Sequence, residues 1–191
     1  MSDFSLWFST GLAHILDLEG YDHICYVVAL AIMFSWRAWK PLLILVTAFT
    51  IGHSLSLALS IFEVVKIPQE SVEFFIPLTI AVTCLSNLYA IYQGNIRFNK
   101  GNYVIALLFG LIHGLGFSYL LKMMLGKEEN AFFPLLSFNL GLEFGQAVIV
   151  TMTVFLTFAV VEVVQIPKKI WQTVVSISVL CISLFLLIGR I

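Results

Sequence analysis

Six ionisable side chains of this sequence lie in or beside long apolar segments. They are all four histidines and two acids, namely His14, His23, His53, His113, Asp22 and Glu143. An ionisable side chain at membrane depth is energetically costly, so its presence there indicates a functional site. Imidazole and carboxylate groups together bind divalent transition metals. The residue types therefore predict a metal site, provided that the fold brings these positions together.

The composition is that of an integral membrane protein. Hydrophobic residues make up 60% of the 191 residues and charged residues only 11%, with a mean hydropathy of +1.01. The apolar runs are continuous rather than alternating, which favours α-helices over a β-barrel. We expect an all-α integral membrane protein with a single transmembrane domain over residues 1–191. The sequence shows no basic patch of the kind that would predict nucleic-acid binding. The expected partners are the lipid bilayer and a metal ion, and the oligomeric state is left open.

Six apolar runs approach or reach the roughly twenty residues that span a bilayer core. We expect transmembrane helices at about 21–36, 41–62, 72–92, 103–123, 138–163 and 170–189. In residues 3–16, apolar side chains recur at helical spacing opposite Ser5, Ser9 and Thr10. This pattern predicts an N-terminal amphipathic helix that lies at the membrane interface. The expected fold is a bundle of about six transmembrane helices plus this interfacial helix.

Basic residues gather in alternate loops of the predicted bundle. These pairs are Arg37 and Lys40, Arg97 and Lys100, and Lys168 and Lys169. Because cytoplasmic loops carry an excess of Lys and Arg, we expect these three loops on the cytoplasmic side. Both the N-terminus and the C-terminus are then predicted outside.

Three of the ionisable groups are expected at similar depth. At a rise of about 1.5 Å per residue, His53, His113 and Glu143 lie roughly 15–16 Å from the ends of their helices. That is near the middle of a hydrocarbon core about 30 Å thick. The first predicted span is short, so we expect its outer end to be recessed beneath the N-terminal helix. This recess brings His14, Asp22 and His23 towards the other three residues.

The neighbours of His53 and His113 indicate close helix packing. Phe49–Ser56 and Phe109–Gly116 both read F-x-x-x-H-small-L-small. Small residues let transmembrane helices approach closely, which helps imidazoles from two helices reach one ion. Polar side chains beside the site are expected to orient the ligands. They are Asn139, Gln146 and Ser54.

At these residues the chain resembles the HupE/UreJ family of bacterial membrane proteins. The resembling pieces are G-L-A-H-I-L followed by Y-D-H at 11–23, T-A-F-T-I-G-H-S-L-S-L-A at 47–58, F-G-L-I-H-G-L-G-F at 109–117 and F-N-L-G-L-E-F-G-Q at 138–146. The resemblance implies a multi-helix protein of the bacterial inner (cytoplasmic) membrane, associated with nickel or cobalt uptake. It also implies that His14, Asp22 and His23 bind metal, and that His113 and Glu143 belong to the family's later motifs. The spacing between His14 and Asp22 is longer than in the family's first motif, and an interfacial histidine is ordinary, so His14 is the weakest ligand of the set.

Two functions fit these residues. The first is a permease for a divalent metal of the nickel, cobalt or zinc type, with Thr47, Thr50, Thr83, Ser86 and Asn87 as an inward route. The second is a zinc-dependent intramembrane hydrolase acting on a lipid or a membrane peptide, because three histidines with one open position are the catalytic zinc arrangement. In that enzyme His23, His53 and His113 hold zinc, and Glu143 or Asp22 is the general base. An accessory membrane subunit with polar interhelical contacts is a third reading.

Overall fold

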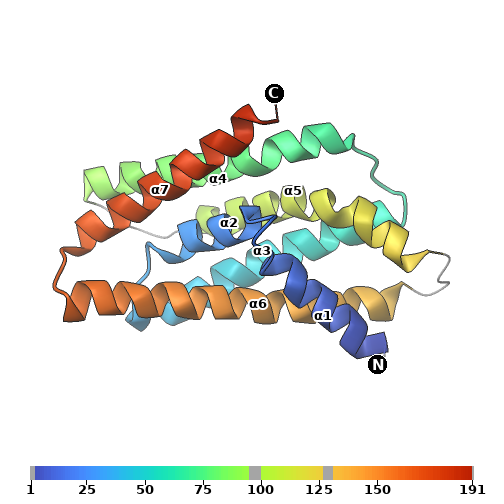
Figure 1. The fold of residues 1–191 in the computed structure, drawn as a ribbon, viewed down its shortest axis with the longest axis horizontal. Coiled ribbons are helices and arrows are strands. Elements are labelled where there is room, and N and C mark those ends of the chain that lie inside the picture. Colours follow the sequence, from blue (N-terminus) through green and yellow to red (C-terminus); the bar gives the residue numbers. More distant parts are fainter. Residues whose placement is uncertain (1–2, 95–99, 127–130, 191) are drawn as a thin grey trace.

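A computed structural model describes residues 3–94, 100–126 and 131–190, which form a bundle of helices (Figure 1). In chain order the elements are α1 (Asp3–Ile15), α2 (Asp22–Ala31), the 3₁₀ turn η1 (Trp36–Ala38), α3 (Trp39–Ile61), α4 (Gln69–Gln93), α5 (Lys100–Leu125), α6 (Phe132–Phe158), the π-helical turn η2 (Ala159–Val163) and α7 (Lys168–Ile188). No strand occurs within these described ranges. The predicted all-α class is confirmed for this part of the chain.

In the part of the chain that the structure describes, five helices are long and apolar enough to cross a membrane. They are Trp36–Ile61, Gln69–Gln93, Lys100–Leu125, Phe132–Val163 and Lys168–Ile188. These five match the second to sixth expected spans. The main difference is at α6, which begins at Phe132 and has Pro134 in its first turn, where the missing N–H of proline costs no helical hydrogen bond.

The expected spanning helix at 21–36 is not formed. The helix α2 has only 10 residues, a length of about 15 Å that cannot cross a bilayer core. Ile32, Met33 and Phe34 leave the helix yet stay almost fully buried. The Nε2 atom of Gln172 donates hydrogen bonds to the carbonyl oxygens of Ile32 and Met33, at 3.0 and 3.3 Å. The Gln172 side chain thus gives hydrogen-bond partners to two carbonyl groups that have left the helix. Irregular backbone inside a membrane protein is tolerated when it is paired in this way.

The predicted N-terminal helix is present as α1, and its apolar face packs along α6. Trp7, Gly11 and Ile15 are buried there. A Cβ atom added to Gly11 would overlap the carbonyl oxygen of Phe138, so the two backbones touch. Contact with α6 therefore accounts for the amphipathic pattern without a lipid interface. In Figure 1, α1 runs from the N-terminus to the middle of the bundle, and α2 continues from there towards the far end.

A second pair of helices, α3 and α5, crosses in the same way. A Cβ atom on Gly110 would overlap the carbonyl oxygen of Phe49, and one on Gly52 would overlap that of Leu107. The glycine contacts of α1 and α5 are followed by the same short motif, G-L-A-H at 11–14 and G-L-I-H at 110–113. In both helices, a histidine therefore lies one turn beyond the point of closest approach.

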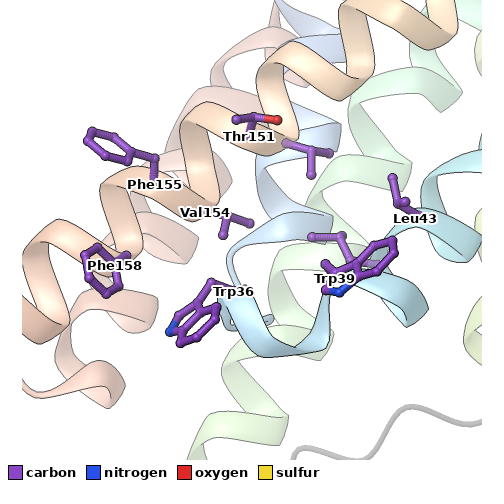
Figure 2. Close-up of a pocket in the computed structure, with 9 residues that line it drawn as sticks. Trp36, Trp39, Leu43, Thr151, Val154, Phe155 and Phe158 are labelled. Atoms are coloured by element: carbon purple, nitrogen blue, oxygen red, sulfur yellow. The ribbon is translucent and has the colours of Figure 1, made fainter.

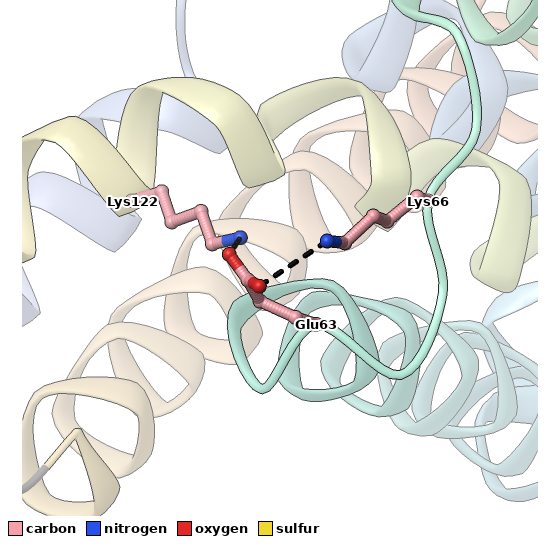
Figure 3. A network of polar contacts seen from close by, with 3 residues as sticks. All are labelled: Glu63, Lys66 and Lys122. Atoms are coloured by element: carbon pink, nitrogen blue, oxygen red, sulfur yellow. Dashed lines mark hydrogen bonds and ion pairs between the residues drawn. The ribbon is translucent and has the colours of Figure 1, made fainter.

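The two ends of the bundle differ in charge. At the end where α3 stops and α4 starts, which we call the acidic end, the described acids include Glu63, Glu70 and Glu73. The Glu63 carboxylate accepts from Lys122 Nζ at 3.0 Å and pairs with Lys66 Nζ at 3.2 Å (Figure 3). The hydrogen bonds from Lys122 and Lys66 lower the pKa of Glu63. The opposite end, which we call the basic end, carries Arg37, Lys40, Lys100, Lys168 and Lys169.

Candidate functional site

All four histidines meet in the interior of the bundle, each from a different helix. The ring centroid of His23 lies 4.6 Å from that of His14, 5.5 Å from that of His53 and 5.2 Å from that of His113. The helices α1, α2, α3 and α5 supply one ring each. The glycine contacts described above permit this, because they bring α3 against α5 and bring the C-terminal turn of α1 into the bundle.

Three of the imidazoles offer nitrogen atoms to a common point. Ligand atoms of His14, His23 and His53 all lie within 4.8 Å of one another. A tetrahedral ion with metal–nitrogen bonds of about 2.0–2.1 Å would hold its ligand atoms about 3.3 Å apart. Small rotations of the three rings would therefore bring them to coordination distance.

Buried nitrogen atoms of the cluster have no hydrogen-bond partner. These atoms are Nε2 of His14, His23 and His113 and both ring nitrogens of His53. Buried polar groups are almost always paired, because an unpaired one costs roughly 1–3 kcal/mol. Several such atoms close together indicate a binding site for an ion or a polar ligand.

The orientation of His113 also suits a ligand. Its Nδ1 lies 2.9 Å from the carbonyl oxygen of Phe109, one turn earlier on α5. A carbonyl oxygen only accepts, so Nδ1 carries the hydrogen and donates it. The lone pair is then on Nε2, which is buried without a partner. His113 is not among the three histidines whose ligand atoms lie within 4.8 Å of one another. Metal-binding histidines are commonly fixed in one tautomer by such a bond.

A pocket of about 240 Å³ leads from the surface to the cluster. Its inner part is lined by His14, His23 and His113, and its outer part by charged side chains. The charged residues are Asp17, Asp22, Glu73 and Arg190. Arg190 Nη1 and Glu73 Oε2 form an ion pair at 2.6 Å, which links α7 to α4 beside the opening. Asp22 thus lies on the path to the histidines.

On the other side of the cluster, aromatic rings close the interior. Tyr26 and Phe49 are fully buried, and their ring centroids are 4.6 Å apart. The ring centroid of His113 lies 4.9 Å from that of Tyr26 and 5.2 Å from that of Phe49. Beyond Tyr26 is a smaller cavity of about 100 Å³, lined by Thr83, Ser86 and Asn87 among others. Tyr26 therefore lies between the histidines and a second, largely apolar cavity that contains a few polar side chains.

A family comparison agrees with the motifs that meet here. The family model described as HupE / UreJ protein matches residues 1–190. The chain belongs to the HupE/UreJ family. This family is associated with nickel and cobalt uptake. Neither a curated protein nor a solved structure matches the chain.

Two of the remaining predicted residues of this HupE/UreJ protein have hydrogen-bond partners on another helix. Glu143 is not in the group of ligand atoms described above, and its Oε1 accepts a hydrogen bond from Thr47 Oγ1 at 2.8 Å. One turn further along α6, Gln146 Oε1 accepts from Thr50 Oγ1 at 2.7 Å. Both bonds join α6 to α3. The structure therefore gives Glu143 and Gln146 interhelical partners, and neither Glu143 nor His113 is in the group of three converging ligand residues.

Of the other two polar residues, Ser54 is bonded within its own helix, and the role of Asn139 stays a prediction. Ser54 Oγ donates to the carbonyl oxygen of Thr50 on its own helix, at 2.7 Å. Asn139 has a buried Oδ1 atom without a partner. The expected inward route divides in two, because Thr47 and Thr50 contact α6 while Thr83, Ser86 and Asn87 line the small cavity.

Sequence reasoning did not single out the aromatic residues around the site. Phe117 lies with its ring centroid 3.9 Å from that of His14, and Tyr26 and Phe49 cover His113. One signal was available for Phe49 and Phe109, which occupy the first position of the repeated F-x-x-x-H motif in this HupE/UreJ chain. In this motif a phenylalanine lies one turn before His53 and another lies one turn before His113.

Proposed function

We propose that this protein is a permease for a divalent transition-metal ion of the nickel or cobalt type, and that His14, His23, His53 and His113 form its binding site. The observation that carries the proposal is the set of buried imidazole nitrogens without partners at the base of an open pocket. A metal ion would accept their lone pairs and remove the cost of leaving them unpaired. Nickel, cobalt and zinc all suit imidazole ligands.

The charges of the pocket support the passage of a cation. Asp17, Asp22 and Glu73 line the opening together with Arg190, which is paired with Glu73. The two remaining carboxylates leave the opening net negative, and carboxylates at the mouth of a narrow path raise the local concentration of a dication. The histidines themselves are neutral ligands, so an ion reaching them exchanges its water for imidazole nitrogen. A transport site must bind strongly enough to fill and weakly enough to empty.

The aromatic rings give the proposed permease a closed state. The pocket reaches the histidines from one side, while Tyr26 and Phe49 block the other. Transport then requires these rings to move so that the ion reaches the cavity at Thr83, Ser86 and Asn87. Tyr26 and Thr83 line this cavity together, so the closing ring forms part of the cavity wall.

The direction of uptake follows from the charges at the two ends. If the basic end faces the cytoplasm, as the positive-inside rule predicts, the pocket opens to the outside. A membrane-impermeant thiol reagent tests this orientation in intact cells. In a Cys181→Ser background, we expect Glu70→Cys at the acidic end to react and Lys169→Cys at the basic end to react only after lysis. The reverse pattern would contradict the proposed direction.

The hydrolase alternative has no support from the geometry of Glu143. That carboxylate is bonded to Thr47 and lies outside the group of histidine nitrogens, whereas a general base must reach the metal-bound water. Asp22 lines the pocket, but a carboxylate on the path of a cation serves the permease equally well.

Reconstitution in liposomes tests the proposed function. The full chain is purified, its bound metal is identified, and influx of Ni²⁺, Co²⁺ and Zn²⁺ is measured for the protein and for His53→Ala. We expect His53→Ala to lower metal affinity and influx at least roughly tenfold. The matched control is Ser54→Ala, which changes the adjacent residue and should leave both unchanged. Tight stoichiometric zinc without influx of any of the three ions would overturn the permease proposal.

A further inference from the structure

A wide apolar groove lies at the basic end, far along α6 from the histidines' pocket. Its volume is about 640 Å³, and it lies between the start of α3 and the last turns of α6. Figure 2 shows Trp36 and Trp39 at one end and Val154, Phe155 and Phe158 along the α6 side. The polar groups of this lining are the indole N–H groups of Trp36 and Trp39 and the hydroxyl of Thr151, which donates to the carbonyl oxygen of Ala147 in its own helix. The rest of the trough is apolar.

Two cations stand over the tryptophans that line this groove. Arg37 Cζ lies 5.2 Å from the centroid of the Trp36 ring, and Lys40 Nζ lies 5.6 Å from the centroid of the Trp39 ring. Both distances are within the range of a cation–π interaction. The contacts hold the two charges at the tryptophan end of the groove. Both basic side chains are also exposed, so they remain available to an anion.

The groove thus combines an apolar trough with a positive charge at one end. An occupant of matching chemistry has an apolar chain and an anionic head. Tryptophans favour the level of the membrane headgroups, which places Arg37 and Lys40 where lipid phosphates lie. In the orientation argued above, this level belongs to the cytoplasmic leaflet, where anionic lipids carry a negative surface potential.

We propose that this groove is a binding site for an anionic phospholipid. One acyl chain lies in the trough between α3 and α6, and the phosphate contacts Arg37 and Lys40. The site is independent of the metal-transport proposal, because it uses none of the histidines and none of the residues of their pocket.

Lipid exchange on the full-length protein tests the proposal. The protein is placed in nanodiscs that contain equal amounts of phosphatidylglycerol and phosphatidylcholine with identical chains, and the lipids that it retains are counted by native mass spectrometry. We expect retained phosphatidylglycerol to exceed phosphatidylcholine several-fold. The double variant Arg37→Gln/Lys40→Gln should bring that ratio close to one.

Two further variants separate a site from a general effect of charge. Lys168→Gln/Lys169→Gln removes the same charge from the same end of the bundle without touching a groove residue, and it should keep the wild-type ratio. Val154→Trp fills the trough while every cation stays in place, and it should lower the amount of retained lipid. An equal loss in both double variants would show nonspecific attraction and overturn the proposal. It would also be overturned if Val154→Trp kept its lipid, or if Leu43→Cys formed a disulfide-linked dimer in good yield, since a second copy of the chain would then cover the groove.

Discussion

Gly110 lies so close to the carbonyl oxygen of Phe49 that a Cβ atom on the glycine would overlap it. This contact fixes the distance between α3 and α5 one turn before His113. The first prediction concerns this contact. Gly110→Ala should force the helices apart, and overpacking of this kind costs about 1–3 kcal/mol. We expect a lower thermal midpoint in detergent together with weaker metal binding.

The control for this prediction is Gly189→Ala. A Cβ atom there would meet its nearest neighbour at 3.5 Å, an ordinary contact, so stability and metal binding should both be retained. If Gly110→Ala were as stable as Gly189→Ala, the backbones of α3 and α5 would not be in contact as described.

The second prediction concerns Glu143, which hydrogen-bonds to Thr47. Glu143→Gln keeps an oxygen that can accept this bond but removes the charge and most of the capacity to bind metal. We expect its metal affinity, measured by calorimetry, to stay within about threefold of wild type, while a ligand loss such as His23→Ala costs at least roughly tenfold. A loss in Glu143→Gln as large as that in His23→Ala would place the carboxylate in the site after all.

Tyr26 is the subject of the third prediction. In the proposed permease its ring separates the histidines from the inner cavity, so Tyr26→Ala should open a path between the two spaces. We expect faster metal influx in liposomes with little change in affinity. Tyr119→Ala is the matched control, since Tyr119 is an exposed tyrosine of α5 outside the site. Influx unchanged in Tyr26→Ala, with the protein still folded, would contradict the closing role of this ring.

The fourth prediction uses the backbone of Glu63. Its φ of 59° is in the left-handed region that favours glycine, and Glu63 directly follows the C-terminal cap of α3. Glu63→Gly should therefore give a higher thermal midpoint than Glu63→Ala, because both variants lose the ion pairs with Lys66 and Lys122 but only glycine relieves the backbone. Equal midpoints for the two variants would show that the backbone is not strained.

The contribution of Glu63 to the stability of the folded protein should depend on pH. Because the pKa of Glu63 is lowered in the folded protein, its contribution to stability is complete above the unfolded pKa and is lost as pH falls through the folded one. The difference in midpoint between wild type and Glu63→Ala should therefore shrink on acidification. The effect is expected to be small, since the ion pairs are exposed. A difference that grew at low pH would show the opposite sign of the pKa shift.

Hydropathy predicts much of this fold. Where the prediction from hydropathy is wrong, the reason is physical. The five long helices were predicted because each apolar run matches the thickness of a bilayer. The run that continues through Ile32, Met33 and Phe34 misled the prediction, because a segment buried in protein is as apolar as one buried in lipid. Bonds from distant side chains explain how that loop is accommodated, above all the bond from Gln172, 140 residues later in the sequence.

The site shows a second limit of sequence reasoning. Counting residues along a helix gives the depth of a side chain but not its direction around the bundle. The depths predicted for His53 and Glu143 were similar, yet one faces the other histidines and the other faces Thr47. His14 was the weakest candidate because its helix was expected at the membrane surface. The contact of Gly11 with Phe138 brings that helix inside.

The pairing of α1 with α6 also sets the order in which the protein can be assembled. Residues 3–15 are synthesised long before residues 132–158, yet their buried face is covered mainly by the later helix. During insertion into the membrane, α1 can therefore pack into the bundle only after α6 has been synthesised and inserted. His14 cannot reach the other histidines before that point. Contacts so distant in sequence slow folding. The complete cluster of four histidines is thus a late product of biogenesis, and a chain that stops before α6 has no stable place for its first helix.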